Sequence, residues 1–466
     1  MMNSDSTATT IPIDLLRKYD RPGPRYTSYP TAPIWSEDVG GDRYAEALKK
    51  ASAVADVPLS LYCHIPFCRK RCFYCGCNTC IVKGDTSVDA YTEELCKEIV
   101  WTAERLQPRR KVRQLHFGGG TPTYVGVERL GQILDCMEQS FEFDETCERS
   151  MEIDPRLTTP EQLEFLAQRG FNRISLGVQD FDPDVQVSIG RIQPHEQVTT
   201  VLGHCRRLGF KGINFDLIYG LPLQTVGSFS RTLERVIELR PDRLAVYSFA
   251  FLPTVKAHQS KIDQGDLPTT EVKYQLFAKA IEMFTGAGYK QIGMDHFALP
   301  DDELSLAQAD GRLYRNFMGY SIQAAPEMIG IGMSSIGYVD DGFFQNVSKL
   351  KEYGRRIDDS NCAVYRGMKL SDDDLIRQYL ITSLMCNFRL DIAPFEERFG
   401  IRYNDYFSEE RTRLSGFVED ALLEVSSDRL VVTQVGRAFV RNIAMTFDAY
   451  LKGDAPGKKA TYSRTI

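Results

Sequence analysis

Short apolar runs alternate with amphipathic stretches from about residue 59 to residue 300. Runs of strand type are predicted at 59–65, 112–117, 150–153, 173–178, 213–218, 243–249 and 291–294. Apolar positions at helical spacing fill the intervals, for example at 89–105, 160–168, 194–208 and 226–239. Strand–helix alternation is typical of a parallel sheet with helices outside it. The pattern therefore predicts an α/β fold, an open or partial barrel of the (β/α)6 type.

The same pattern divides the chain into four segments. An N-terminal extension (1–55), which we expect to act as a lid, precedes the barrel (56–300). A Gly- and Met-rich connector (301–370) leads to a mainly helical C-terminal domain (371–466). In that domain, residues 416–442 read as helix, short hairpin, helix, which resembles a winged-helix module. Such modules often bind DNA, but the fold alone does not establish function. Residues 429–441 contain no dense basic run, so we expect a structural or lid role.

Length and composition limit the number of domains, the kind of partner and the cellular compartment that we expect. With 466 residues the chain is long enough for more than one domain, and its net charge of −7 argues against a nucleic-acid partner. No apolar stretch approaches the roughly 20 residues that span a bilayer. The first ten residues are polar and lack a signal-peptide core. We therefore expect a cytoplasmic protein without membrane insertion, where reducing conditions suit free thiols.

Three cysteines directly after the first predicted strand carry the strongest chemical signal. Cys68, Cys72 and Cys75 are spaced C-x3-C-x2-C. An electron-transfer 4Fe–4S cluster usually takes four cysteines, so three leave one iron open to a ligand such as S-adenosylmethionine (SAM). Fe–S clusters and SAM both carry radical chemistry. Disulfides favour small secreted chains and zinc sites usually pair two C-x2-C motifs, so both alternatives are weaker.

Six of the 12 cysteines lie between residues 63 and 80, so the choice of ligands needs an argument. The spacing selects Cys68, Cys72 and Cys75. Cys77 is left with two roles open, as a fourth ligand in the absence of SAM or as a catalytic group near the substrate.

Further unusual residues stand at the ends of the later strands. Gly118–Gly120 and Thr121 follow the second strand, and Glu152, Gln179 and Asp216 end the third, fourth and fifth, with Arg191 just beyond. In a (β/α) barrel the chemistry lies at the carboxyl ends of the strands. Each residue taken singly is more often structural, as a turn glycine or a satisfied polar group. Their agreement in position predicts one shared site.

The residues together resemble the oxygen-independent coproporphyrinogen III oxidases of the radical-SAM superfamily. The resemblance covers nearly the whole chain. Its motifs are PRYTSYPT at 24–31, YCHIPFC at 62–68, CGCN at 75–78, HFGGGTPT at 116–123, GVQDF at 177–181, DLIYGLP at 216–222, GMDHF at 293–297 and CNFR at 386–389.

The resemblance implies a 4Fe–4S cluster on Cys68, Cys72 and Cys75 and two SAM molecules. The residues implied at the first SAM are Tyr62, Gly119, Glu152 and Ile336. Those implied at the second are Tyr74, Gly120, Thr121, Gln179, Arg191, Asp216 and Ala250.

The resemblance also implies a reaction. A SAM-derived 5′-deoxyadenosyl radical would drive the anaerobic oxidative decarboxylation of coproporphyrinogen III to protoporphyrinogen IX in heme biosynthesis. Two propionates become vinyl groups, and Arg25 and Arg315 are candidates to pair with propionates. We expect a monomer that takes electrons from a donor such as flavodoxin or ferredoxin. A heme chaperone or a heme-modifying radical-SAM methyltransferase is the alternative, although CGCN and the N-terminal motif favour the oxidase.

Overall fold

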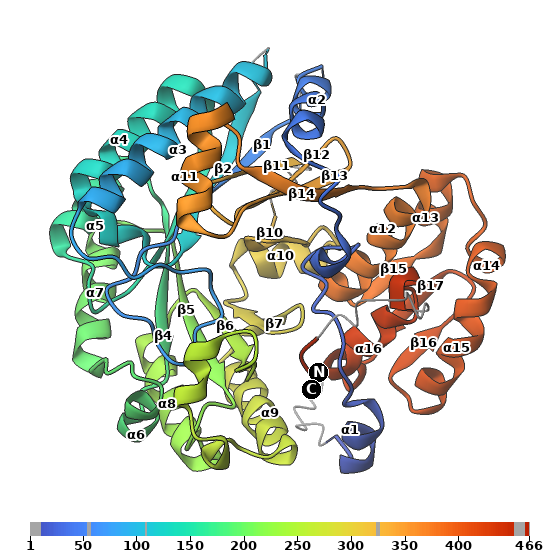
Figure 1. The fold of residues 1–466 in the computed structure, drawn as a ribbon. Helices are drawn as coiled ribbons and strands as arrows, with labels where there is room; N and C mark the ends of the chain where they lie inside the picture. The colour runs from blue at the N-terminus through green and yellow to red at the C-terminus, as the bar shows by residue number, and fades with distance from the viewer. Residues whose placement is uncertain (1–10, 54–56, 108–109, 323–326, 452–461, 466) are drawn as a thin grey trace.

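A computed structural model describes residues 11–53, 57–107, 110–322, 327–451 and 462–465 (Figure 1). Over these residues the core is one 12-stranded sheet with the order β14-β13-β12-β11-β1-β2-β3-β4-β5-β6-β8-β7. Its central strands are parallel: β1 (Leu59–Ile65), β2 (Lys111–Gly119), β3 (Glu142–Ile153), β4 (Arg173–Gln179), β5 (Gly212–Tyr219) and β6 (Arg243–Ser248). The predicted α/β partial barrel is confirmed.

Helices cover the outer face of these strands, on the left and lower sides of Figure 1. They are α3 (Thr86–Arg105), α4 (Gly126–Ser140), α5 (Pro160–Gln168), α6 (Pro183–Ser188), α7 (His195–Arg207), α8 (Val226–Leu239) and α9 (Thr270–Gly286). Local sequence explains several boundaries: Thr159 and Gln162 form a capping box at the start of α5, and Thr225 and Ser228 form one at α8. All of β1 except Tyr62 is buried, as expected for a parallel strand covered on both faces.

The seventh predicted strand differs from expectation. The chain forms a hairpin of β7 (Lys290–Ile292) and β8 (His296–Ala298), and β8 pairs antiparallel with β6. Gly293 has a φ of +52° in the connection, a conformation that suits glycine and allows the tight reversal. The parallel series therefore ends at β6.

Residues 327–369 extend the barrel sheet beyond β1. β11 (Glu327–Ile331) pairs parallel with β1, and β12 (Ile336–Val339), β13 (Gly342–Asn346) and β14 (Val364–Lys369) follow antiparallel. The buried carboxylate of Glu98 on α3 holds this extension by accepting hydrogen bonds from Gly332 N (2.7 Å), Asn346 and Tyr353 (2.6 Å each). Also in the connector are α10 (Glu303–Ala309), β9 (Tyr314–Asn316), β10 (Gly319–Ser321) and α11 (Leu350–Ser360).

The C-terminal part shares a second hydrophobic core with the N-terminal extension and contains a three-stranded sheet in the order β15-β17-β16. Its elements are α12 (Asp372–Asn387), β15 (Arg389–Asp391), α13 (Ile392–Phe399), α14 (Tyr403–Tyr406), α15 (Ser408–Glu419), β16 (Leu423–Val425), β17 (Arg429–Val432) and α16 (Val440–Met445). The helical, winged-helix-like character predicted for this part is confirmed. Among the described helices of the chain, none has the length and apolar character needed to cross a bilayer.

The N-terminal extension contributes α1 (Ile13–Tyr19) and α2 (Gly41–Ala51) to two different neighbours. The Tyr19 ring stacks on Phe417 of the C-terminal core at 5.0 Å, whereas Tyr44 of α2 packs on Trp101 of α3. Backbone hydrogen bonds from Gly23 N to the Ser463 carbonyl (3.0 Å) and from Thr465 N to the Arg21 carbonyl (2.9 Å) place residues 21–23 beside residues 463–465. The extension therefore bridges the barrel and the C-terminal part.

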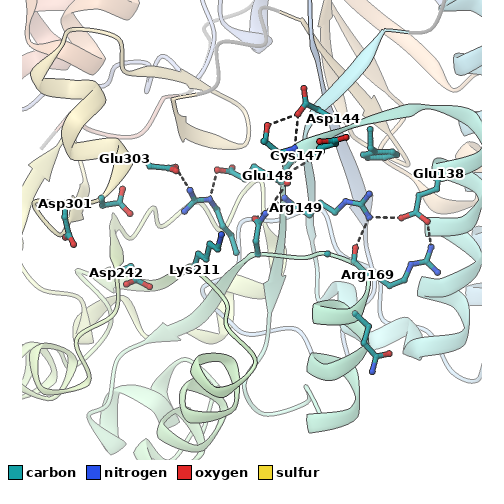
Figure 2. A pocket seen from close by; sticks show the side chains of 18 of the residues that line it. Glu138, Asp144, Cys147, Glu148, Arg149, Arg169, Lys211, Asp242, Asp301 and Glu303 are labelled. Atoms are coloured by element: carbon teal, nitrogen blue, oxygen red, sulfur yellow. Dashed lines mark hydrogen bonds and ion pairs between the residues drawn. The ribbon is translucent and has the colours of Figure 1, made fainter.

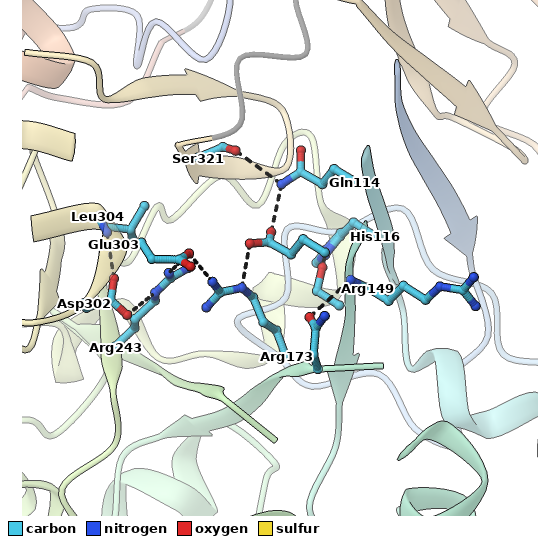
Figure 3. A network of polar contacts seen from close by, with 12 residues as sticks. Gln114, His116, Arg149, Arg173, Arg243, Asp302, Glu303, Leu304 and Ser321 are labelled. Carbon is cyan, nitrogen blue, oxygen red and sulfur yellow. Dashed lines mark hydrogen bonds and ion pairs between the residues drawn. The ribbon is translucent and has the colours of Figure 1, made fainter. Parts of the chain in front are cut away.

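A charged network lies at the amino ends of β3–β6, around a cavity of about 970 Å³ (Figures 2 and 3). Arg173 pairs with both Glu148 and Glu303, and Arg243 pairs with Asp302 at 2.8 Å. No predicted site residue lines this cavity. The network ties the strands together at the end opposite the predicted chemistry.

Candidate active site

A second cavity, of about 1000 Å³, opens at the carboxyl ends of the barrel strands. Thirteen of the fifteen predicted site residues line it: Cys68, Cys72, Tyr74, Cys75, Cys77, Gly119, Gly120, Thr121, Glu152, Gln179, Arg191, Asp216 and Ala250. Because parallel strands end at one edge of the sheet, residues far apart in sequence meet there.

The cysteine loop after β1 is closed at its base by backbone hydrogen bonds. Cys80 N donates to the Pro66 carbonyl (2.7 Å), and Cys68 N donates to the Cys80 carbonyl (3.2 Å). Within the loop, Cys75 N donates to the Cys72 carbonyl at 3.3 Å. These bonds hold the three motif cysteines on one compact turn at the cavity.

The glycine-rich loop packs directly against the cysteine loop. Gly120 N donates to the Ile65 carbonyl and Thr121 N to the Phe67 carbonyl, both at 2.8 Å. A Cβ on Gly120 would lie 2.7 Å from the Phe67 oxygen, and one on Gly119, where φ is +117°, would lie 2.6 Å from the His64 ring. Only glycine permits this approach and this backbone conformation. The loop is therefore built for close packing as well as for a ligand.

Two guanidinium groups point at the sulfur of Cys72. Arg191 Nη1 lies 3.8 Å and Arg156 Nη2 3.9 Å from it, and both arginines also pair with Asp154. Groups that donate to a metal ligand from outside the metal's own shell hold that ligand in its orientation. The sequence analysis missed Arg156, although its place two residues after the strand-ending Asp154 was a usable signal.

The other two motif thiols have different surroundings. A hydrogen bond from Cys77 lowers the pKa of Cys75 to about 6, whereas burial raises the pKa of Cys68 to about 11. The Cys68 sulfur also contacts the Thr121 hydroxyl at 3.6 Å. A bound metal adds its own charge and deprotonates a coordinating thiol outright.

The residues present fit an iron–sulfur cluster. Three free thiols, two flanking guanidiniums and an adjacent cavity meet at one loop. Within the described residues, no trio of His, Cys, Asp or Glu side chains is gathered tightly enough for a single metal ion. A cubane takes one thiolate per iron, so its cysteines stand farther apart than ligands of one ion.

Two carboxylates in the cavity differ in pKa. Burial opposes ionisation of Glu152, but hydrogen bonds from His116 (3.4 Å) and Gly119 N (3.1 Å) keep its pKa below the ordinary value. Burial, with the nearby charge of Glu152, raises the pKa of Asp216 to about 6. Ser175 and Asn214 hydrogen-bond to Asp216 at 3.0 and 2.9 Å. Glu152 therefore keeps its negative charge to a lower pH than Asp216 does.

Two predicted residues do not line the cavity. The Tyr62 hydroxyl contacts His64 Nδ1 at 3.0 Å, and Ile336 packs in a small apolar cluster with Trp35 and Phe343. Both residues lie close to Gly330 of β11. Gly330 pairs with Tyr62 in the sheet, and a Cβ added at Gly330 would lie 2.7 Å from the Ile336 carbonyl. Their roles as SAM contacts stay predictions.

The comparisons with known proteins agree with this geometry. Residues 62–236 match the radical SAM superfamily model, and residues 370–439 match the HemN C-terminal domain. The chain is 44% identical to the oxygen-independent coproporphyrinogen III oxidase of Escherichia coli, over 97% of this chain and 98% of that protein. The chain belongs to the oxygen-independent coproporphyrinogen III oxidase family.

Other members of that family are similarly related. The Pseudomonas aeruginosa oxidase is 42% identical over 94% of this chain and 95% of its own length. The solved structure of E. coli coproporphyrinogen III oxidase (HemN), described as a radical SAM enzyme, superposes with a TM-score of 0.90 at 42% identity, covering 95% of this chain and all of that one. The similarity therefore extends over barrel, extension and C-terminal part alike.

Proposed function

We propose that this protein converts coproporphyrinogen III to protoporphyrinogen IX without oxygen. The observation that carries the proposal is the cavity that unites the three motif cysteines with the glycine-rich loop, in a chain 44% identical to a named oxidase over nearly its full length. At each of two propionates, a hydrogen atom leaves the β-carbon, and loss of CO2 and one electron yields a vinyl group.

Cys68, Cys72 and Cys75 would hold the 4Fe–4S cluster, and the cavity beside them would hold two SAM molecules. When bound, these groups supply the radical that removes the propionate hydrogen. Ionised Glu152, beside Gly119 N–H, is suited to the ammonium of the first SAM. On the other side of the cavity, the guanidinium of Arg191 is held in one orientation because its Nη2 donates to the Gly177 carbonyl at 2.7 Å.

Arg25 is the proposed contact for a substrate carboxylate. It lines the cavity, and its guanidinium pairs with the buried Asp295 at 3.2 Å. Arg315, the other predicted arginine, donates to the Arg25 carbonyl at 3.3 Å and so supports that segment. Arginine recognises carboxylates bidentately, which suits a substrate with four of them.

The proposal also covers the cellular compartment, the oligomeric state and the electron donor of the protein. Twelve cysteines and an iron–sulfur loop favour a reducing, cytoplasmic environment. The net charge of −7 supports the absence of a nucleic-acid partner, and we propose a monomer that receives electrons from flavodoxin or ferredoxin.

The test is an anaerobic assay. The protein is reconstituted with iron and sulfide and given dithionite, SAM, coproporphyrinogen III and a cell extract as electron acceptor. Mass spectrometry should show loss of two CO2 per tetrapyrrole together with 5′-deoxyadenosine. An unchanged substrate with an intact cluster would reject the oxidase and favour a heme chaperone or a methyltransferase, for which heme is the next ligand to try.

A further inference from the structure

Positive charge is concentrated around the cysteine loop of an acidic chain. Residues 68–83 contain four Lys or Arg and no Asp or Glu, and residues 249–262 contain two Lys and no acid. Over the whole chain, acidic residues outnumber Lys and Arg by 63 to 56. Both segments are thus basic, and one of them carries the metal ligands.

The fold joins the two segments into one surface. His258 hydrogen-bonds to the Cys75 carbonyl at 2.8 Å, and Lys256 donates to Asn78 Oδ1 at 3.3 Å. The Lys261 ammonium lies 5.1 Å from the centre of the Phe73 ring. Residues 256–261 thus lie against the outside of the cysteine loop, although almost 180 residues separate them from it in sequence.

The basic side chains on this surface differ in their exposure to solvent. Arg71 is turned inward to Thr79 Oγ1 at 3.2 Å, whereas Arg69, Lys70 and Lys261 are exposed. We call Arg69, Lys70, Lys256 and Lys261 the basic rim. Exposed charges of one sign attract a partner of the opposite sign and speed its encounter.

Exposed apolar side chains accompany the basic rim. Val255 is 64% exposed beside Lys256. Val187 and Ile192, 62% and 66% exposed, flank Ile189, whose carbonyl accepts a hydrogen bond from Phe73 N at 2.9 Å. Apolar contact with charged surroundings is the usual make-up of a protein interface. The surface therefore suits a protein partner better than a small anion alone.

The proposed chemistry requires electrons to enter at this loop. Each reductive cleavage of the SAM sulfonium breaks one C–S bond and consumes one electron, which leaves the donor oxidised by one electron. Cys68, Cys75 and Cys77 line the active-site cavity, whereas Asn78 and Ile81 of the same loop are exposed outside it, so the loop lies between the cavity and the protein surface. We infer that the basic rim is the docking surface for a small, acidic one-electron carrier protein. This inference rests on the proposed function.

The test compares two double variants of the reconstituted enzyme. Lys256→Glu/Lys261→Glu reverses charge on the rim at two positions that do not line the active-site cavity. Lys211→Glu/Arg235→Glu makes the same change of charge at exposed positions that line no part of the active-site cavity. Binding of flavodoxin, and separately of a ferredoxin, is measured by calorimetry across ionic strengths. The rim variant should bind at least about tenfold more weakly at low salt and lose most of its salt dependence, while the control binds as wild type.

A second measurement separates docking from catalysis. With dithionite as reductant, the rim variant should form 5′-deoxyadenosine within about twofold of the wild-type rate, but with the carrier protein its rate should fall at least about tenfold. Equal carrier binding by rim variant and wild type overturns the inference. A parallel loss with dithionite also overturns it, because the two lysines would then support the cysteine loop itself rather than the docking of a carrier. Failure of the proposed function is a different result: wild type with dithionite releases no CO2.

Discussion

The guanidinium of Arg191 lies 3.8 Å from the sulfur of Cys72. Its second nitrogen is fixed to the Gly177 carbonyl, and its Nε is buried without a hydrogen-bond partner among the described residues. One rigid side chain thus links the cluster loop to the end of β4 at the cavity.

Replacing Arg191 with Lys keeps the charge but removes the planar fork. We expect the rate of 5′-deoxyadenosine formation to fall roughly tenfold or more, since a hydrogen bond to a charged group contributes about 1.5–3 kcal/mol. The iron content should stay near wild type. Arg231→Lys, at an exposed position on α8, is the control; an unaltered rate in Arg191→Lys would exclude a role in the site.

The ligand assignment predicts different outcomes for two neighbouring thiols. Cys68→Ser should lose the cluster, its visible absorption and SAM cleavage, because three thiolates are the minimum the motif offers. Cys77→Ser should retain the iron and its absorption. Iron analysis and absorption spectroscopy after anaerobic reconstitution separate the two, and full activity in Cys68→Ser would show that the assignment is wrong.

Gly119→Ala tests the close packing of the glycine-rich loop. The new methyl group would lie 2.6 Å from the His64 ring at a φ of +117°, so both strain and a clash result. We expect a loss of about 1–3 kcal/mol in the free energy of unfolding and weaker SAM binding. Gly209→Ala introduces similar backbone strain, φ +80°, with no atom within 4 Å of the new methyl. It should cost about 1 kcal/mol and leave SAM affinity unchanged.

The raised pKa of Glu94, a residue away from the active site, predicts that the stability of the fold depends on pH. Burial, together with the charge of Asp358, raises the pKa of Glu94 from 4.5 to about 7. The folded state therefore holds this proton more tightly than the unfolded state, and its stabilising contribution, complete below about pH 4.5, is lost as the pH rises through 7.

Glu94→Gln should remove that loss. Relative to wild type, we expect the variant to gain about 1 kcal/mol in the free energy of unfolding between pH 5 and pH 8, after allowance for solvent screening. Urea titrations at both pH values measure it, with the exposed neighbour Glu93→Gln as the control. Equal differences at the two pH values would contradict the shifted pKa.

The ion pair of Arg110 allows the free-energy cost of breaking a buried ion pair to be measured. Its side chain is fully buried at the start of β2, pairs with Glu327 of β11 and donates to the Val57 and Ala51 carbonyls. Glu327→Ala leaves that charge uncompensated and should cost about 3–5 kcal/mol, seen as a lower urea midpoint. Glu142→Ala, which removes the partner of the exposed Lys111, should change stability by less than about 1 kcal/mol.

The sequence by itself determined the elements and the chemistry of the cysteine loop. The bounds of β1, α5 and α8 are those expected from periodicity and capping residues, since such signals act over a few neighbouring positions. The C-x3-C-x2-C spacing is local in the same sense, because ligands on one turn need no distant partner. The positions of Glu152, Gln179 and Asp216 at the ends of predicted strands also indicated that these residues lie at one edge of the sheet, where they line the same cavity.

Only the tertiary structure decided which distant segments meet. The pairing of β11 with β1, the pairing of β8 with β6, the ion pair of Arg25 with Asp295 and the approach of Arg156 to Cys72 join residues 51 to 270 positions apart. Strand pairing and side-chain contacts of this kind depend on how complete elements pack and fill space, which no local pattern specifies.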